Sequence, residues 1–89
     1  MEPVDVALVL AIDVSASVDY DEFLLMVGGL SGAFLDAGVI AAATGGPRGA
    51  VAVTAIFWSE EQEVAMPWQR LADAADGGRI AEALAAAPR

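Results

Sequence analysis

The chain has 89 residues, of which 57% are hydrophobic, and its 13 acidic residues outweigh 4 arginines to give a formal net charge of −9. This length allows one small domain at most, and the apolar composition excludes a disordered segment. The negative charge argues against nucleic acid and anionic membrane surfaces as partners. The sequence contains neither Cys nor His, which excludes disulfides, thiolate and imidazole metal sites, and a cysteine nucleophile.

The amino terminus shows no targeting segment. It reads Met1-Glu2-Pro3 without a basic region, and the apolar run that follows is too short to span a bilayer. We therefore expect no signal peptide and no membrane insertion in this chain. The compartment of a parent protein, exported or not, stays open.

The first predicted element is a strand over Val4–Ile12, apolar on both faces apart from Asp5, as in an interior parallel strand covered on two sides. Directly after it, Asp13, Ser15 and Ser17 stand at alternate positions. Their oxygens suit a small divalent cation, and residues two apart share a face of an extended segment. The spacing predicts a metal site where the strand ends; the alternative is that Asp13 caps a helix or a turn.

A helix is predicted to begin at Asp19, because Glu22 three residues later completes a capping box. Its core face is formed by residues at spacings of four, three and four: Phe23, Val27, Leu30 and Phe34. Gly28-Gly29 in mid-helix costs about 1 kcal/mol per glycine, and we expect close packing against the sheet as compensation. A short helical turn over 36–43 follows.

Two further strands are predicted. Val51–Trp58 is again apolar on both faces except for one Thr, and a right-handed crossover makes it parallel to the first strand, so that it ends at the same edge as Asp13. A polar turn then leads into an antiparallel strand, roughly Glu63–Trp68, which Pro67 places at the edge of the sheet. Trp58 and Trp68 are interpreted as packing residues in preference to ligand platforms.

The last predicted element is a helix that begins at Asp73 or Asp76 and runs to about Ala86, where Pro88 ends it. It carries a narrow apolar stripe: Ile80, Ala83, Leu84 and Ala87. The order of elements is therefore strand, helix, strand, strand, helix.

Several short segments together resemble a known family. Asp-x-Ser-x-Ser after a hydrophobic first strand is similar to the metal-ion-dependent adhesion site of von Willebrand factor A domains. Gly-Pro-Arg-Gly before the second strand, Phe57-Trp58-Ser59 at its end and Val64-Ala65-Met66-Pro67-Trp68 after it resemble a bacterial von Willebrand A-like family of unknown function. The resemblance covers almost the whole chain. It implies an α/β, three-layer, Rossmann-like fold, with residues 1–89 forming a single partial domain, its amino-terminal half.

The resemblance also implies a role for each motif residue. Asp13 would act largely through water, and Ser15 and Ser17 would be direct hydroxyl ligands of Mg²⁺ or Mn²⁺. Family members complete the site with a Thr on a later loop and an Asp after strand 4; neither has a counterpart in this chain, since Thr44 and Thr54 stand elsewhere. We therefore expect weak, water-rich metal binding.

Other chemistries fit less well. A calcium loop needs Gly at position 18 and Glu at position 24, where this chain has Val and Leu. A phosphoaspartate receiver normally needs a lysine, a haloacid-dehalogenase-type phosphatase has Asp at position 15, and no phosphate loop or nucleophile elbow occurs. Without His or Cys we expect no catalysis.

We predict a non-enzymatic, metal-dependent protein-binding module whose partner supplies an acidic side chain. In the family strand order 3-2-1-4-5-6, the first strand is central, so without a fourth strand its edge is unpaired and invites self-association. The alternative is a metal-free scaffold or assembly domain that acts through this strand edge. Metal-dependent phosphoryl transfer ranks last.

Overall fold

The structure of the chain, a computed structural model, describes residues 2–87. The expected end of the last helix at Pro88 lies outside the described residues. Three strands and three helices follow one another in these residues, in the order β1 (Ala7–Asp13), α1 (Tyr20–Ala33), α2 (Ala37–Thr44), β2 (Val51–Trp58), β3 (Gln62–Leu71) and α3 (Ala74–Ala86). The predicted elements are all present; β1 begins at Ala7 instead of Val4 and ends one residue later than expected, and β3 is longer at both ends than expected.

The strands form one mixed sheet in the order β1-β2-β3. β1 pairs with β2 in parallel, and β2 pairs with β3 antiparallel. This α/β arrangement is compatible with a Rossmann-like fold; among the described strands, β3 lies at one edge of the sheet, as Pro67 predicted, and β1 at the other.

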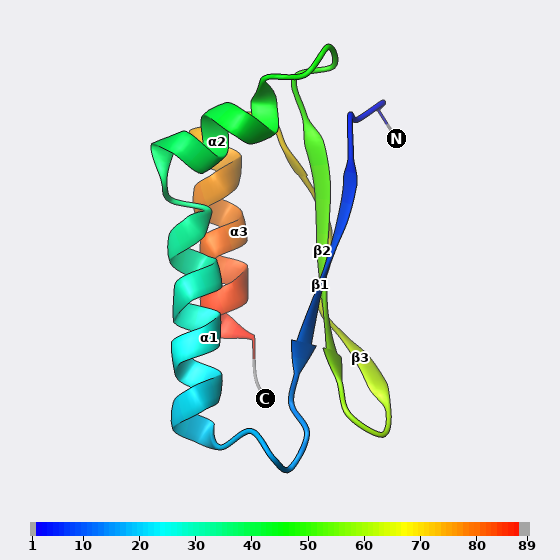
Figure 1. Cartoon of the computed structure of the whole chain (residues 1–89). Helices are drawn as coiled ribbons and strands as arrows, with labels where there is room; N and C mark the ends of the chain where they lie inside the picture. Colours follow the sequence, from blue (N-terminus) through cyan, green and yellow to red (C-terminus); the bar gives the residue numbers. More distant parts are fainter. Residues whose placement is uncertain (1, 88–89) are drawn as a thin grey trace.

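All three helices lie on the same side of the sheet (Figure 1). α1 and α3 run side by side along it, and α2 crosses near the end at which β2 begins. The chain therefore supplies two layers, a sheet and one helix layer. The core between them is made of side chains from every strand and from α1 and α3, including Ile12, Phe23, Val53, Phe57, Met66, Leu71, Ile80 and Leu84.

The start of each long helix is fixed by a capping aspartate. Asp19 accepts a hydrogen bond from the Glu22 backbone N–H at 2.8 Å, and the Glu22 side chain accepts one from the Asp19 backbone N–H, so the predicted capping box is present. Asp73, one of the two predicted caps, accepts from the Asp76 N–H at 2.8 Å and starts α3. Caps of this kind satisfy backbone donors that a helix leaves unpaired.

α3 meets the junction between α1 and α2 at Gly77. A Cβ there would collide with the carbonyl oxygen of Phe34 and would lie 2.6 Å from Cδ1 of Ile40. Gly77 is buried, so its missing side chain is what lets the helices approach. A hydrogen bond from Ser31 Oγ to the Ala81 carbonyl oxygen, 2.9 Å long, joins α1 to α3 further along.

The register between β2 and β3 shifts around Thr54, which marks a bulge. Thr54 is only 7% exposed, and its hydroxyl donates to the Met66 carbonyl oxygen at 2.7 Å. The hydroxyl thus provides a hydrogen bond where the regular backbone pairing is interrupted, which explains a polar residue in an otherwise apolar strand.

Three expectations about packing need correction. Within residues 2–87, helices cover one face of β1 and not both, and Val9 on the other face is 50% exposed. Gly28 and Gly29 do not pack closely against the sheet, since nothing lies within 4 Å of a Cβ at either position. Trp58 and Trp68, interpreted as packing residues, are 40% and 46% exposed. The predicted α1 core face is confirmed, with Phe23, Val27 and Phe34 buried and Leu30 packed against them.

Within residues 2–87, no single helix is both long and apolar enough to cross a membrane. α1 and α2 meet the criterion only when taken together, and their axes are bent by 62° at the break between them.

Candidate functional site

The predicted metal motif lies at the carboxyl ends of the two parallel strands. Asp13 is the last residue of β1 and is in register with Trp58, the last residue of β2. The next residue, Val14, donates its N–H to the Trp58 carbonyl oxygen at 3.0 Å, so the two strands stay together as the chain turns away. In open α/β sheets this edge is where ligands bind.

The turn after β1 is held by its own side chains. The Ser15 N–H donates to Oδ1 of Asp13 at 2.8 Å, and the Val18 N–H donates to the Ser15 carbonyl oxygen at 3.0 Å. The hydroxyl oxygens of Ser15 and Ser17 lie 2.9 Å apart. The structure therefore brings all three predicted ligands into one turn, with Asp13 and Ser15 half-buried and Ser17 exposed.

The spacing of the motif explains this convergence. Asp13 still belongs to the strand, and its carboxylate reaches forward to the backbone two residues on, which is the hydrogen bond of an Asx turn. That turn is also what the alternative interpretation of Asp13 required. The hydrogen bond uses one carboxylate oxygen of Asp13, Oδ1. The observed turn is therefore compatible with both interpretations of Asp13, as a metal ligand and as a turn residue.

Two open hollows flank the turn. One, of about 370 Å³, is lined by Val14, Ser15, Ala16, Trp58, Ser59 and Glu60. The other, of about 300 Å³, is lined by Val14, Phe57, Ser59, Glu60, Glu61 and Glu63. Among the lining residues of the two hollows, Ser15 is the one member of the motif, and Ser59 and Glu60 of the turn between β2 and β3 line both hollows.

The sequence predicts no role for Ser59 and Glu60 beyond a polar turn. The signal that points to them is the parallel pairing of β1 and β2, because residues that directly follow two neighbouring parallel strands meet at one edge. Glu60 adds a carboxylate to the hollow that contains Ser15.

The side-chain oxygens of Asp13, Ser15 and Ser17 are of the type that a hard cation prefers, and they are too few to hold one tightly. Within residues 2–87, no three acidic, His or Cys side chains come together in a way that could hold a metal ion. Any ion at this turn would therefore depend on one carboxylate and on hydroxyl groups, with water filling the other positions. Mg²⁺ commonly keeps several waters in this manner.

The match to a family model covers residues 3–89, and that family is described as proteins of unknown function, DUF1194. The chain belongs to DUF1194. No curated protein matches it significantly. Among solved structures, the three amino-terminal domains of the type V pili tip protein Mfa5 from Porphyromonas gingivalis are similar in fold.

The similarity to Mfa5 has a TM-score of 0.51 at 18% sequence identity. It covers 94% of this chain and 14% of the Mfa5 chain, so the DUF1194 chain spans only a small part of that structure. At this identity the similarity shows a shared arrangement of strands and helices and does not transfer a function.

Proposed function

We propose that this DUF1194 chain is a metal-dependent protein-binding module of the von Willebrand A type. Asp13, Ser15 and Ser17 would hold Mg²⁺ or Mn²⁺, and the ion, when bound, would offer an open position to an acidic side chain of a protein partner. Asp13 would act through water and the two serines through their hydroxyls. The chain has no His or Cys, and we propose no catalytic role for it.

The separation of the two serine hydroxyls carries this proposal. Two neighbouring ligands of an octahedral Mg²⁺ with bonds of 2.0–2.1 Å stand about 2.9 Å apart. The Ser15 and Ser17 oxygens are 2.9 Å apart, as a hydrogen-bonded pair also is, so the turn needs no rearrangement of these two atoms to accept an ion. The carboxylate of Asp13 on the same turn supplies negative charge.

The test is a titration of the chain with Mg²⁺ and Mn²⁺, by calorimetry and by the relaxation of water protons around Mn²⁺. We expect saturable binding in the millimolar range, lost in Asp13→Asn and in the Ser15→Ala/Ser17→Ala double variant. Asp13→Asn is informative because an amide oxygen can still accept the hydrogen bond from the Ser15 N–H. Asp21→Asn is the matched control, since it removes the same charge from an exposed position of α1.

A carboxylate probe examines the open position. If a protein carboxylate can bind the ion, acetate should displace a water from the bound Mn²⁺ and lower the relaxation enhancement of the wild-type chain. Equal binding by wild type and Asp13→Asn, or no binding by a folded wild-type chain, would remove the basis for the proposal.

The second candidate is a metal-free scaffold that acts through the exposed edge of β1, and one observation favours it. Within residues 2–87, β1 pairs with a strand on one side only, and the side chains of Leu8 in β1 and of Val6 just before it are exposed. Such an edge can accept a strand from a partner or from a second copy of the chain.

Chelation separates this candidate from the first. Binding or self-association that persists in EDTA and is lost in Val6→Lys would support the edge, because lysine is a residue that blocks strand addition. Leu25→Lys, at a side chain 78% exposed on α1 and away from the sheet, is the control. An effect of EDTA on association would instead favour the metal-dependent module.

A further inference from the structure

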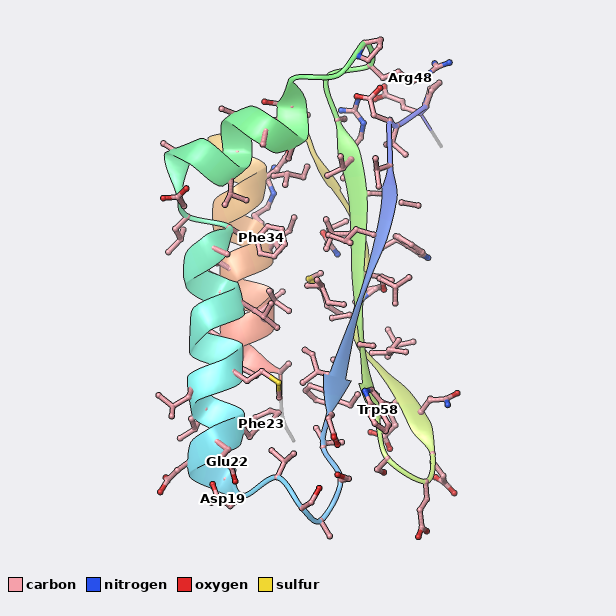
Figure 2. All side chains as sticks on the ribbon, viewed as in Figure 1. Asp19, Glu22, Phe23, Phe34, Arg48 and Trp58 are labelled. Atoms are coloured by element: carbon pink, nitrogen blue, oxygen red, sulfur yellow. The ribbon has the colours of Figure 1, made fainter. Side chains whose placement is uncertain are left out.

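The hollow of about 370 Å³ beside the motif is lined from two directions. Ser15 comes from the turn after β1, and Trp58 and Glu60 come from the end of β2 and the turn that follows it. Figure 2 shows Trp58 where β2 gives way to this turn. The parallel register that sets Asp13 opposite Trp58 holds the two walls together. The hollow therefore adjoins Ser15, a residue that the proposed function assigns to the metal site.

Two groups in this hollow suit a cationic side chain. The carboxylate of Glu60 supplies a negative charge, and the ring of Trp58 supplies an aromatic surface. The Trp58 side chain is 40% exposed, so part of it is open to a ligand. Tryptophan is the aromatic side chain that attracts cations most strongly across its ring face. A lysine or arginine side chain in the hollow can therefore contact the ring and the carboxylate together.

The surroundings of the hollow are acidic. Glu61 and Glu63 line the neighbouring hollow, which Glu60 also borders, and no arginine of residues 2–87 lines either one. An acidic side chain of a partner that approaches a metal ion at Ser15 meets the carboxylate of Glu60 in the same hollow, and the two like charges repel each other. A positive charge next to the acidic side chain in the partner replaces this repulsion with attraction.

We propose that the hollow between Ser15 and Glu60 receives a lysine or arginine side chain of the protein partner, next to the acidic side chain that the metal ion takes. This inference rests on the proposed function and narrows its partner to a segment with a basic residue beside an acidic one. Glu60 pairs with the basic group, and the ring of Trp58 packs against its aliphatic stem or its charge. Neither residue holds the metal, so their loss should change which segment binds and not whether the ion binds.

The exposure of both contacts sets the size of the effect. Glu60 and Trp58 are exposed to solvent. An exposed ion pair and an exposed contact between a cation and an aromatic ring together correspond to about tenfold in affinity, roughly threefold from each. Because the ion pair is screened by salt, the gain should shrink as the ionic strength rises.

The experiment uses the metal-loaded full chain and short peptides with blocked ends: Ala-Asp-Ala, Lys-Asp-Ala and Ala-Asp-Lys. Binding is measured with Mn²⁺ by the fall in the relaxation enhancement of water protons. The emission of Trp58 is recorded with Mg²⁺ in a Trp68→Phe background. At least one lysine peptide should bind about tenfold more tightly than Ala-Asp-Ala and should change the emission of Trp58, whereas Ala-Asp-Ala should leave it unchanged.

Three variants make the test specific. Glu60→Gln should weaken the lysine peptides about threefold, because it removes the pairing charge, and should leave Ala-Asp-Ala equally well bound or better bound, because it removes the repulsion. Trp58→Leu keeps an apolar side chain without the aromatic face and should also weaken the lysine peptides about threefold. Glu63→Gln is the matched control. It removes the same charge at the start of β3, from a residue that does not line the hollow of Ser15, and the preference for lysine should persist.

The failure of this inference is distinguishable from the failure of the proposed function. Equal affinities of the three peptides for a wild-type chain that binds Mn²⁺ and Ala-Asp-Ala would overturn this inference alone. So would an equal loss of the lysine preference in Glu60→Gln and Glu63→Gln, because that result shows a general attraction to an acidic chain. A wild-type chain that binds no Mn²⁺ would overturn both.

Discussion

Gly77 is the position at which the packing of the helices can be tested most sharply. In Gly77→Ala, the new methyl group meets the Phe34 carbonyl oxygen, which belongs to the backbone, and Cδ1 of Ile40. The side chain of Ile40 can turn aside, but the backbone at Phe34 can yield only if α1 and α3 separate. The substitution should therefore disturb the contact between these helices.

The magnitude follows from two opposing effects. Alanine is favoured over glycine in a helix interior by about 1 kcal/mol. Overpacking of a close contact costs about 1–3 kcal/mol or more. We expect Gly77→Ala to lower the free energy of unfolding by about 1–2 kcal/mol. Gly29→Ala is the matched control: nothing lies within 4 Å of its Cβ, so only the propensity gain of about 1 kcal/mol applies and the protein should become more stable.

Urea unfolding followed by circular dichroism measures both variants against the wild type. For a domain of this size, 1 kcal/mol corresponds to a shift in Tm of about 4–8 °C, so thermal melts should move in opposite directions. If Gly77→Ala stabilised the protein as much as Gly29→Ala, the close approach of α3 to the α1–α2 junction would be wrong.

Three further outcomes are expected. Asp19→Ala, which removes the capping box with Glu22, should cost about 1 kcal/mol in urea unfolding, and an unchanged midpoint would show that this cap is not formed. Thr54→Val keeps the side-chain shape but leaves the Met66 carbonyl oxygen without its hydroxyl donor, and should cost about 1–2 kcal/mol; a gain in stability would contradict the buried hydrogen bond. If the metal proposal holds, Mg²⁺ at ten times its Kd should stabilise the wild type by about 1.4 kcal/mol and leave Asp13→Asn unaffected in thermal melts.

Much of the fold could be predicted from local patterns. The apolar runs, the capping box at Asp19 and the spacing of the α1 core face predicted elements that the structure contains, because hydrogen bonds and side-chain periodicity within a short segment decide them. Pro67 predicted an edge strand, since it cannot donate a backbone hydrogen bond, and β3 is at the edge. The convergence of Ser15 and Ser17 also followed from spacing alone.

Other features depended on which elements meet in space. Gly28 and Gly77 both stand inside helices, and the sequence singled out the first; only Gly77 lies against another segment. An isolated sequence window does not contain the identity of the neighbour, so it cannot say where a missing Cβ is needed. For the same reason, the sequence predicts only a turn at Glu60. The position of Glu60 beside Ser15 depends on the parallel pairing of β1 with β2.

The sequence by itself determined the elements, their caps and the oxygen-rich turn at residues 13–17, since each depends on interactions within a few residues. The tertiary structure decided which sheet face is covered. An apolar strand reads the same whether one face or both are buried, because hydrophobic patterning records a preference for burial and not the partner that provides it. In this chain the helices take one face, and the side chains of Val9, Trp58, Val64 and Trp68 are left exposed on the other.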